Sequence, residues 1–296
     1  MNPDSVRAVA RKDFIDAVRS RGLLALTTLF VVFFGAAAFF FVTQIGGSVQ
    51  QQAGNVLSSN SFLRSLSNIT RLFVPLTGAV VAYAAIVGER SSGTLKLLLS
   101  LPHDRSDVVV GKLLGRGAVV AVPVLLGLLI AVPMFPLAGV SFDPLNYLLF
   151  AALTVLVGLA FVAIGVGVSA STDSNTRAAI GTFVPFAFFA LLWGQLAGEV
   201  VRRLQSQLDL GQQALLEVYF GFRALNPLAA YQMVASSIGS PRAQLSLFSP
   251  PTRQSYAQQF GSLPWYLSDA ALVGILVLWV VVPVAVGYLA FERSDL

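Results

Sequence analysis

Six long apolar stretches, with nearly every charged residue placed between them, constrain this chain more than any other feature of its sequence. Hydrophobic residues make up 56% of the chain and charged residues 11%, and the mean hydropathy is +0.77. A water-soluble domain carries far more charge on its surface. Each stretch has about the length that a helix needs to cross a bilayer: Leu23–Val42, Leu72–Val87, Ala118–Leu137, Leu145–Val168, Ala178–Leu196 and Ala270–Phe291.

The length of these stretches predicts helices and not the strands of a barrel. Barrel strands show short alternating patterns, whereas helices satisfy their own backbone groups inside a bilayer. We therefore predict an all-α integral membrane protein, with a six-transmembrane-helix bundle that forms a single transmembrane domain over residues 1–296.

Prolines and small residues within the predicted spans indicate how the helices bend and pack. Proline removes a helical hydrogen bond, so bends are expected at Pro75, Pro123, Pro133, Pro185 and Pro283. The fourth span has no proline. It carries small residues that let helix backbones approach closely, and packing is their expected role: Gly158, Ala163, Gly165 and Gly167.

The basic residues predict the orientation. Cytoplasmic segments of membrane proteins are enriched in Lys and Arg. Basic residues gather before the first span and between the second and third spans, so these segments and both termini are expected in the cytoplasm. The net charge of +5 is explained by this pattern and needs no nucleic acid. An excess of Arg over Lys with abundant Ala, Val and Gly is typical of a GC-rich prokaryote. We therefore expect this chain to lie in a prokaryotic plasma (inner) membrane.

Residues 1–21 have the pattern of an amphipathic helix. Val6, Phe14 and Val18 recur at helical spacing on one face, and Arg7 with other basic residues occupies the rest. Such a helix lies in the cytoplasmic interface with its apolar side in the lipid; a solvated basic leader is the alternative. The following apolar run is longer than that of a cleaved signal peptide, so we expect an uncleaved anchor.

Two segments are predicted on the opposite side of the membrane. Gln44–Asn68 is polar and reads as a loop, and residues 198–269 form a much longer connection than usual. Apolar residues at helical spacing, interrupted by Gly211, predict one or two amphipathic helices in this long extracytoplasmic loop. They could pack on the membrane, on a partner or on the bundle itself.

The sequence offers little for catalysis or metal binding. We find no ionisable residue in the middle of any predicted span, and the chain has no cysteine and one histidine, His103. Gly111-Lys112 lacks the leading glycine and the following Ser or Thr of a phosphate-binding loop. We therefore expect no catalytic residue, no metal site and no nucleotide site in this chain.

The segment between the second and third spans carries the clearest pattern. Thr94 can cap a short helix, Leu95, Leu98 and Leu99 share one face of it, and Pro102 ends it. Ser106, with Asp107 in the first turn, is expected to cap the next helix. An exposed leucine face is typical of a helix that docks into a groove of another protein. A helix on lipid headgroups or under its own bundle fits equally well.

Three stretches of this sequence resemble type-2 ABC exporter permeases, also called ABC-2 type transporter permeases. The most specific is Glu89–Leu95 with Leu98–Pro102 and Gly111-Lys112; the others are Asn226–Tyr231 and the ending Phe291–Leu296. The resemblance implies that residues 1–21 are an elbow helix, with Val6, Arg7, Phe14 and Val18 as its residues. It also implies that residues 89–107 are a cytoplasmic coupling segment whose helix docks into a separate ATPase subunit. The coupling residues would be Glu89, Arg90, Gly93, Thr94, Leu95, Leu98, Leu99 and Pro102, with Glu89 near the cytoplasmic gate.

The resemblance further implies a complex that moves substrate outward. Two permease copies, or two related chains, would work with two soluble ATPase subunits that bind ATP and Mg, while this chain binds no cofactor itself. Substrates of the family include lipids, polysaccharides, drugs, antibiotics and sodium. One branch supports copper-site maturation of nitrous oxide reductase, but scarce His, Met and Cys give no sign of copper ligation here.

Two other functions compete with the permease interpretation. A membrane anchor or assembly scaffold would recruit a partner through the outside loop without transport. An intramembrane enzyme is disfavoured by the missing catalytic groups. The amino-acid sequence does not identify the substrate or distinguish a homodimer from a heterodimer.

Overall fold

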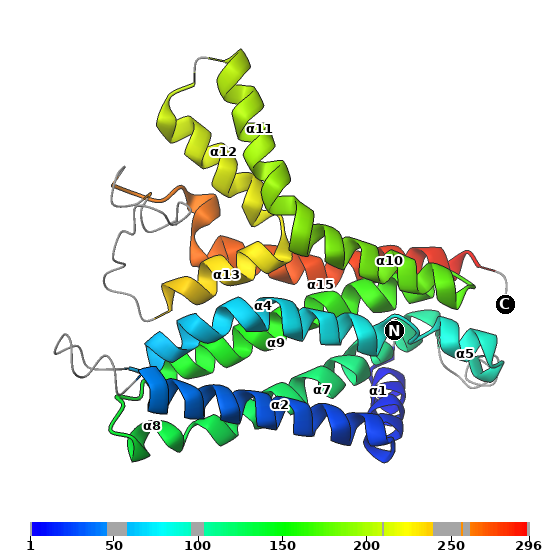
Figure 1. Cartoon of the computed structure of the whole chain (residues 1–296). Helices are drawn as coiled ribbons and strands as arrows, with labels where there is room; N and C mark the ends of the chain where they lie inside the picture. The colour runs from blue at the N-terminus through cyan, green and yellow to red at the C-terminus, as the bar shows by residue number, and fades with distance from the viewer. Residues whose placement is uncertain are drawn as a thin grey trace.

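The computed structural model describes residues 2–45, 58–95, 104–208, 210–238, 256 and 261–294. These residues form helices and connecting turns, with no β-strand among them. Six of their helices are long and apolar enough to cross a membrane, which confirms the predicted all-α membrane bundle. In Figure 1 these helices run side by side, and one pair of helices extends away from the bundle.

The candidate membrane spans begin and end as follows: Arg21–Thr43, Ser59–Ser91, Arg105–Leu137, Pro144–Ala170, Asn175–Gln207 and Asp269–Glu292. The first span consists of α2 (Arg21–Phe40) and the start of the wide turn η1 (Phe41–Ile45), and the second contains α4 (Ser59–Ala82) and α5 (Val87–Ser91). The third contains α7 (Arg105–Ala131) and α8 (Met134–Leu137), and the fourth is α9 (Pro144–Ala170). The fifth contains α10 (Asn175–Ala187), η2 (Phe188–Leu192) and α11 (Trp193–Gln207), and the sixth is α15 (Asp269–Glu292). The helix α1 (Pro3–Arg19) precedes them.

Helix α9 forms the centre of the bundle, and small residues let its neighbours approach closely. A Cβ atom on Gly78 of α4 would lie 2.6 Å from the carbonyl oxygen of Gly158. A Cβ on Gly167 would clash with the carbonyl oxygen of Pro283 in α15. Because real Cβ atoms cannot come so close, these contacts require glycine. The packing role predicted for the glycines of the fourth span is confirmed.

The second membrane helix begins earlier than predicted. We expected it to begin at Leu72, after a polar loop over Gln44–Asn68, but α4 begins at Ser59. Phe62, Leu63 and Leu66 are buried at helical spacing, while polar residues occupy the other face of the same turns. The average polarity of this stretch therefore hid an amphipathic helical extension, which places Arg71 within α4.

The first turn of α7 also differs from the prediction. We expected Ser106 as its N-cap, but α7 begins at Arg105 and Asp104 is the capping residue. The Asp107 carboxylate accepts a hydrogen bond from the backbone N–H of Asp104, completing a reciprocal capping box. An acidic residue two positions earlier therefore performs the role assigned to the serine.

The described part of the segment predicted to lie outside, residues 198–269, is largely helical. It contains the end of α11, then α12 (Gln212–Ala224), α13 (Pro227–Ser237) and the short turn η3 (Trp265–Leu267). Gly211 is the N-cap of α12, as the break in the apolar pattern indicated. Pro185 lies just before η2, and the chain changes direction there between α10 and α11 in Figure 1.

Both chain ends lie at the same end of the bundle, beside α5 (Figure 1). The backbone N–H of Asn2 donates to Asp107 in the first turn of α7, at 2.9 Å. Ser294 accepts a hydrogen bond from Arg90 at 2.8 Å. The elements predicted to be cytoplasmic thus gather in one place.

Candidate functional site

Helix α1 is held against α7 by two glycines one helical turn apart. A Cβ on Gly111 would lie 2.7 Å from the Cβ of Val9, and one on Gly115 would lie 3.0 Å from the carbonyl oxygen of Ala10. Glycine is needed at both positions because any side chain would push α1 away. This close approach brings charged residues of α1 next to those of α7.

A buried ion network joins α1, α5 and α7. Lys112 of α7 donates at 2.7 Å to Asp13 of α1 and at 2.7 Å to Glu89 of α5. The Lys112 and Asp13 side chains are 2% and 4% exposed. Arg116 also pairs with Asp13 at 3.0 Å. A buried charge is tolerated when it is paired in this way, so removing one member leaves another uncompensated.

The rim of the network is partly exposed. Lys12 lies 3.5 Å from Glu89 and 3.4 Å from Asp16. Burial lowers the pKa of Lys12, but the carboxylates of Glu89 and Asp16 outweigh this and raise its pKa above the usual value. Lys12 therefore stays charged at neutral pH and completes the neutralisation of Glu89.

The buried face of α1 differs from the predicted one. Val6 and Val9 are buried with Asp13, whereas Phe14 is half-buried and Val18 is 46% exposed. We expected Val6, Phe14 and Val18 to enter the lipid together. Val6 instead packs on α7, because the glycines of α7 and the ion pair to Asp13 select the adjoining face. Arg7 is exposed, as expected for the polar side.

A break in the second membrane helix positions Glu89 and Arg90. Turns at Tyr83–Ile86 separate α4 from α5, and the Ser169 hydroxyl accepts hydrogen bonds at 3.0 Å from the N–H groups of Ile86 and Val87. These bonds satisfy backbone donors that the break would leave unpaired. Because Ser169 lies near the end of α9, α5 is attached to the central helix.

Two arginines hold the end of α15. Arg90 donates to the Ser294 hydroxyl at 2.8 Å and to the carbonyl oxygen of Thr172 at 3.4 Å. Arg105 donates to the carbonyl oxygens of Glu292 and Ser294, at 2.8 and 2.9 Å. Both guanidinium groups lie over the Phe291 ring, 5.6 and 5.3 Å from its centroid. We call this arrangement the arginine clamp.

The predicted coupling segment is described only at its two ends. Gly93 has a φ of +79°, a conformation that favours glycine, and the Thr94 hydroxyl donates to the carbonyl oxygen of Glu89 at 3.3 Å. Leu95 is 1% exposed and belongs to the hydrophobic core. It therefore differs from the prediction that it forms part of an exposed docking face. Leu98, Leu99 and Pro102 lie outside the described residues.

Sequence comparison with known proteins identifies the family to which this chain belongs. Residues 7–296 match the family described as ABC-2 family transporter protein. The chain belongs to the ABC-2 transporter family. It is 29% identical over 295 residues to the probable ABC transporter permease protein NosY of Pseudomonas aeruginosa, covering 98% of this chain and 99% of that protein. It is 37% identical over 119 residues to the NosY protein of Stutzerimonas stutzeri, covering 40% and 41% of the two chains.

This ABC-2 transporter chain has a further contact that sequence reasoning missed. Tyr231 of α13 is buried, and its hydroxyl lies 2.7 Å from that of Thr70 and 3.1 Å from that of Thr154. Burial raises the pKa of Tyr231 to about 12, so its hydroxyl stays protonated. The contact joins α13 to α4 and α9. It explains one residue of the Asn226–Tyr231 stretch that resembles the family.

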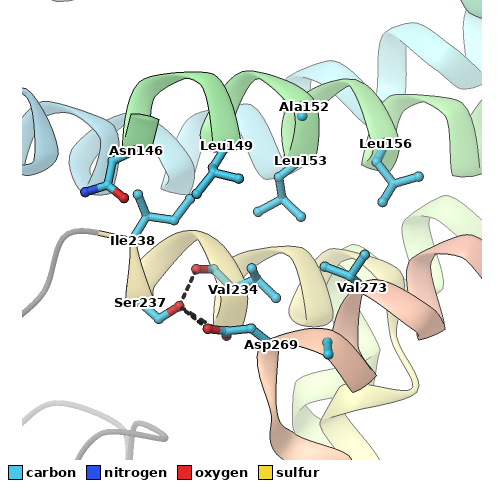
Figure 2. Close-up of a pocket in the computed structure, with 11 residues that line it drawn as sticks. Asn146, Leu149, Ala152, Leu153, Leu156, Val234, Ser237, Ile238, Asp269 and Val273 are labelled. Carbon is cyan, nitrogen blue, oxygen red and sulfur yellow. Dashed lines mark hydrogen bonds between the residues drawn. The ribbon is translucent and has the colours of Figure 1, made fainter. Parts of the chain in front are cut away.

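A cavity of about 540 Å³ lies among α9, α13 and α15 of this ABC-2 chain. Figure 2 shows Leu149, Leu153 and Val273 along its wall, with Ser237 and Asp269 at one end. The Ser237 hydroxyl donates to the Asp269 carboxylate at 3.1 Å. The cavity is therefore apolar along its length and polar at one end.

Within the part of the chain that the structure describes, no group of three or more His, Cys, Asp or Glu side chains could hold a metal ion. The site at the end of the bundle where both chain ends lie consists of cation–carboxylate pairs and backbone contacts. Such an arrangement can transmit a displacement between helices, because its buried charges hold one another in place.

Proposed function

We propose that this chain is the permease subunit of an ATP-driven exporter and that a separate soluble ATPase subunit drives it. The observation that carries the proposal is the attachment of both ends of segment 89–107 to other helices. Glu89 joins α1 and α7 through Lys112, and the arginine clamp joins the same segment to α15. A push on this segment would therefore move several membrane helices together.

The break between α4 and α5 supports this mechanism. The turns at Tyr83–Ile86 give the second membrane helix a place to bend, while Ser169 holds the first residues beyond the break. Closure of an ATPase pair beneath the membrane would displace α5 and the start of α7 as a unit. The bound α1 and α15 would follow, and the outward half of the bundle would open.

The proposed complex contains two ATPase subunits and a second permease copy or a related chain. ATP and Mg would bind in the ATPase subunits. The chain ends at the same end of the bundle support a topology with both termini in the cytoplasm, in a prokaryotic plasma (inner) membrane. The exposed apolar side chains on the bundle would contact lipid. The name of the Pseudomonas aeruginosa relative, a probable ABC transporter permease, favours the same assignment.

The cavity among α9, α13 and α15 is suited to an amphipathic cargo. Its wall of leucine and valine suits a hydrocarbon portion, and the Ser237–Asp269 pair with Asn146 suits a polar portion. A preference for amphipathic cargo agrees with the character of the spans, which are apolar apart from a few hydroxyl groups.

The test is co-purification with the ATPase subunit encoded beside this chain. The variants Leu98→Glu and Leu99→Glu place a charge on the predicted docking face, and we expect about a tenfold or greater loss of bound ATPase. Leu208→Glu is the matched control, because Leu208 is exposed at the end of α11 on the opposite side. Retention of the ATPase by both variants would count against the proposal.

A scaffold that recruits a partner through its outer segment is the second candidate. It is favoured by α11 and α12, which extend away from the bundle in Figure 1. It predicts that replacing residues 198–224 with a short linker abolishes function, while the Leu98 and Leu99 variants keep it. The opposite pattern supports the permease.

A further inference from the structure

Another, smaller cavity is lined by residues of α4, η2, α11, α12 and the start of α13. Its volume is about 350 Å³. The residues that matter for its chemistry are Arg71, Phe189, Trp193, Tyr219, Arg223 and Asn226. It shares no lining residue with the cavity of Figure 2 and lies apart from the ion network around Lys112.

Two guanidinium groups face this cavity. Arg71 donates to the Gln232 side-chain oxygen at 2.7 Å, and its Nε is buried without a hydrogen-bond partner among the described residues. Arg223 donates to the Tyr219 hydroxyl at 3.2 Å and lies 5.4 Å from the centre of the Tyr219 ring. Both arginines line the same cavity, so two positive charges are held near one another. Because arginine does not deprotonate in proteins, both charges persist.

Arg71 is also unusual by position. It lies in the interior of α4, within a helix that is long and apolar enough to span a membrane. A charge at such a position is costly and is a marker of a functional site. Arg71 directly precedes the predicted second span, which begins at Leu72, and it falls within the longer helix α4 because that helix begins at Ser59.

No carboxylate lines the cavity among the described residues. The described carboxylates of the outer half have other contacts: Asp143 caps α9, Glu199 pairs with Arg202 and Arg203, Glu217 accepts from Tyr256, and Asp269 accepts from Ser237. Of the residues between Gln44 and Ala270 that the structure does not describe, only Asp209 is acidic. Among the described residues that line the cavity, the two arginines therefore have no carboxylate as a counter-charge.

The start of α13 adds to the positive potential. Asn226 is its N-cap and lines the cavity with Leu228 and Ala229. The N-terminus of a helix carries a partial positive charge that favours anions. This contribution points the same way as the two arginines and comes from a different element.

We propose that this cavity binds a phosphate group, supplied as inorganic phosphate or as the headgroup of an anionic lipid. A tetrahedral oxyanion offers oxygens to both guanidinium groups at once, and the planar arginine fork matches such oxygens in pairs. Phe189 and Trp193 would flank the anion and keep water from it. The proposal rests on the outer half of the chain and stands independently of ATP-driven export.

The experiment uses the full chain in a phosphate-free maltoside detergent. Inorganic phosphate, or phosphatidylglycerol in a separate arm, is titrated at constant ionic strength. Tryptophan fluorescence reports binding because Trp193 lines the cavity, and a Trp193→Phe variant identifies that signal among Trp265 and Trp279. Thermal unfolding provides a second readout.

Arg71→Gln and Arg223→Gln are expected to weaken binding about tenfold or more, since each removes charge-assisted hydrogen bonds. Arg202→Gln is the control because Arg202 is exposed and paired with Glu199, and its affinity should match the unaltered chain. Arg71→Lys and Arg223→Lys keep the charge and should bind with intermediate affinity, which separates lost binding from misfolding.

The two arms distinguish the sources of the phosphate. Saturable binding of inorganic phosphate identifies the free ion, and saturable binding of phosphatidylglycerol alone identifies a lipid headgroup. The proposal is overturned if neither ligand binds saturably. It is also overturned if the glutamine variants bind as tightly as the unaltered chain.

Discussion

Lys112 is the residue on which the ion network of α1, α5 and α7 depends most. Its charge is buried between Asp13 and Glu89, which lie 99 and 23 positions away in the sequence. The family resemblance includes Gly111-Lys112, yet no local pattern indicates that Lys112 pairs with a residue of α1. Long-range pairing of this kind depends on how α1 docks, and the spacing of residues does not reveal it.

Replacing Lys112 with Met is expected to destabilise the fold by about 3–5 kcal/mol, because Asp13 and Glu89 lose their buried partner. The measurement is the midpoint of unfolding of the purified chain. Arg177→Met is the control: its pair with Asp173 is exposed, and we expect a change of less than about 0.5 kcal/mol. Adding Asp13→Asn to the Lys112 variant should recover part of the loss. Equal stability of the two single variants would show that the network does not hold α1.

At the scale of the element, hydropathy predicted the existence and order of the membrane helices because a bilayer imposes a length on each apolar run. Their boundaries were less predictable. The start of α4 was missed because polar and buried apolar residues alternate there at helical spacing, and the face of α1 was missed because glycines on α7 select it. The split of the outer segment at Gly211 was predicted correctly, since glycine interrupted an apolar pattern.

The docking of α1 on α7 gives a prediction for Gly111→Ala. The added methyl would lie 2.7 Å from the Val9 side chain and 3.1 Å from the Val6 carbonyl oxygen, so α1 must shift. We expect a loss of about 1–3 kcal/mol, measured as a lower unfolding midpoint. Gly274→Ala is the matched control, because nothing lies within 4 Å of its Cβ position and alanine favours helix there. An equal effect of both changes would argue against tight docking.

For the whole molecule, the family resemblance alone could not supply the arrangement at the end of the bundle where both chain ends lie. The resemblance implied a coupling segment and a gate residue, Glu89. It did not predict that Arg90 and Arg105, at the two ends of this segment, both hold the final turn of α15. Neither residue type nor spacing encodes this contact, because its acceptors are mostly backbone carbonyls.

We predict that breaking the arginine clamp uncouples α15 from the coupling segment but leaves binding of the ATPase subunit intact. The double variant Arg90→Gln with Arg105→Gln should still co-purify with the ATPase subunit, yet α15 should no longer follow the coupling segment. Because the chain has no cysteine, spin labels can be placed cleanly at the exposed Val18 and Leu289. In the unaltered chain α1 and α15 both follow the segment, so ATP should change the separation of the labels little. In the double variant only α1 follows, and we expect a larger ATP-dependent change.

Arg177→Gln is the control for the clamp, since Arg177 is exposed and lies outside it, and its ATP-dependent change should match that of the unaltered chain. An unaltered change in the double variant would mean that α15 moves by another route. Loss of the ATPase subunit in the double variant would instead assign the two arginines to assembly.

The pairing of Lys112 with Asp13 also bears on how the chain is made. Synthesis proceeds from the N-terminus, so Asp13 leaves the ribosome long before its partner and must remain hydrated until the third membrane helix arrives. The hold of Arg105 on the carbonyl of Ser294 forms later still, 189 positions along the chain. This end of the bundle is therefore completed only after Ser294 has been made, and a product truncated before α15 would lack that contact.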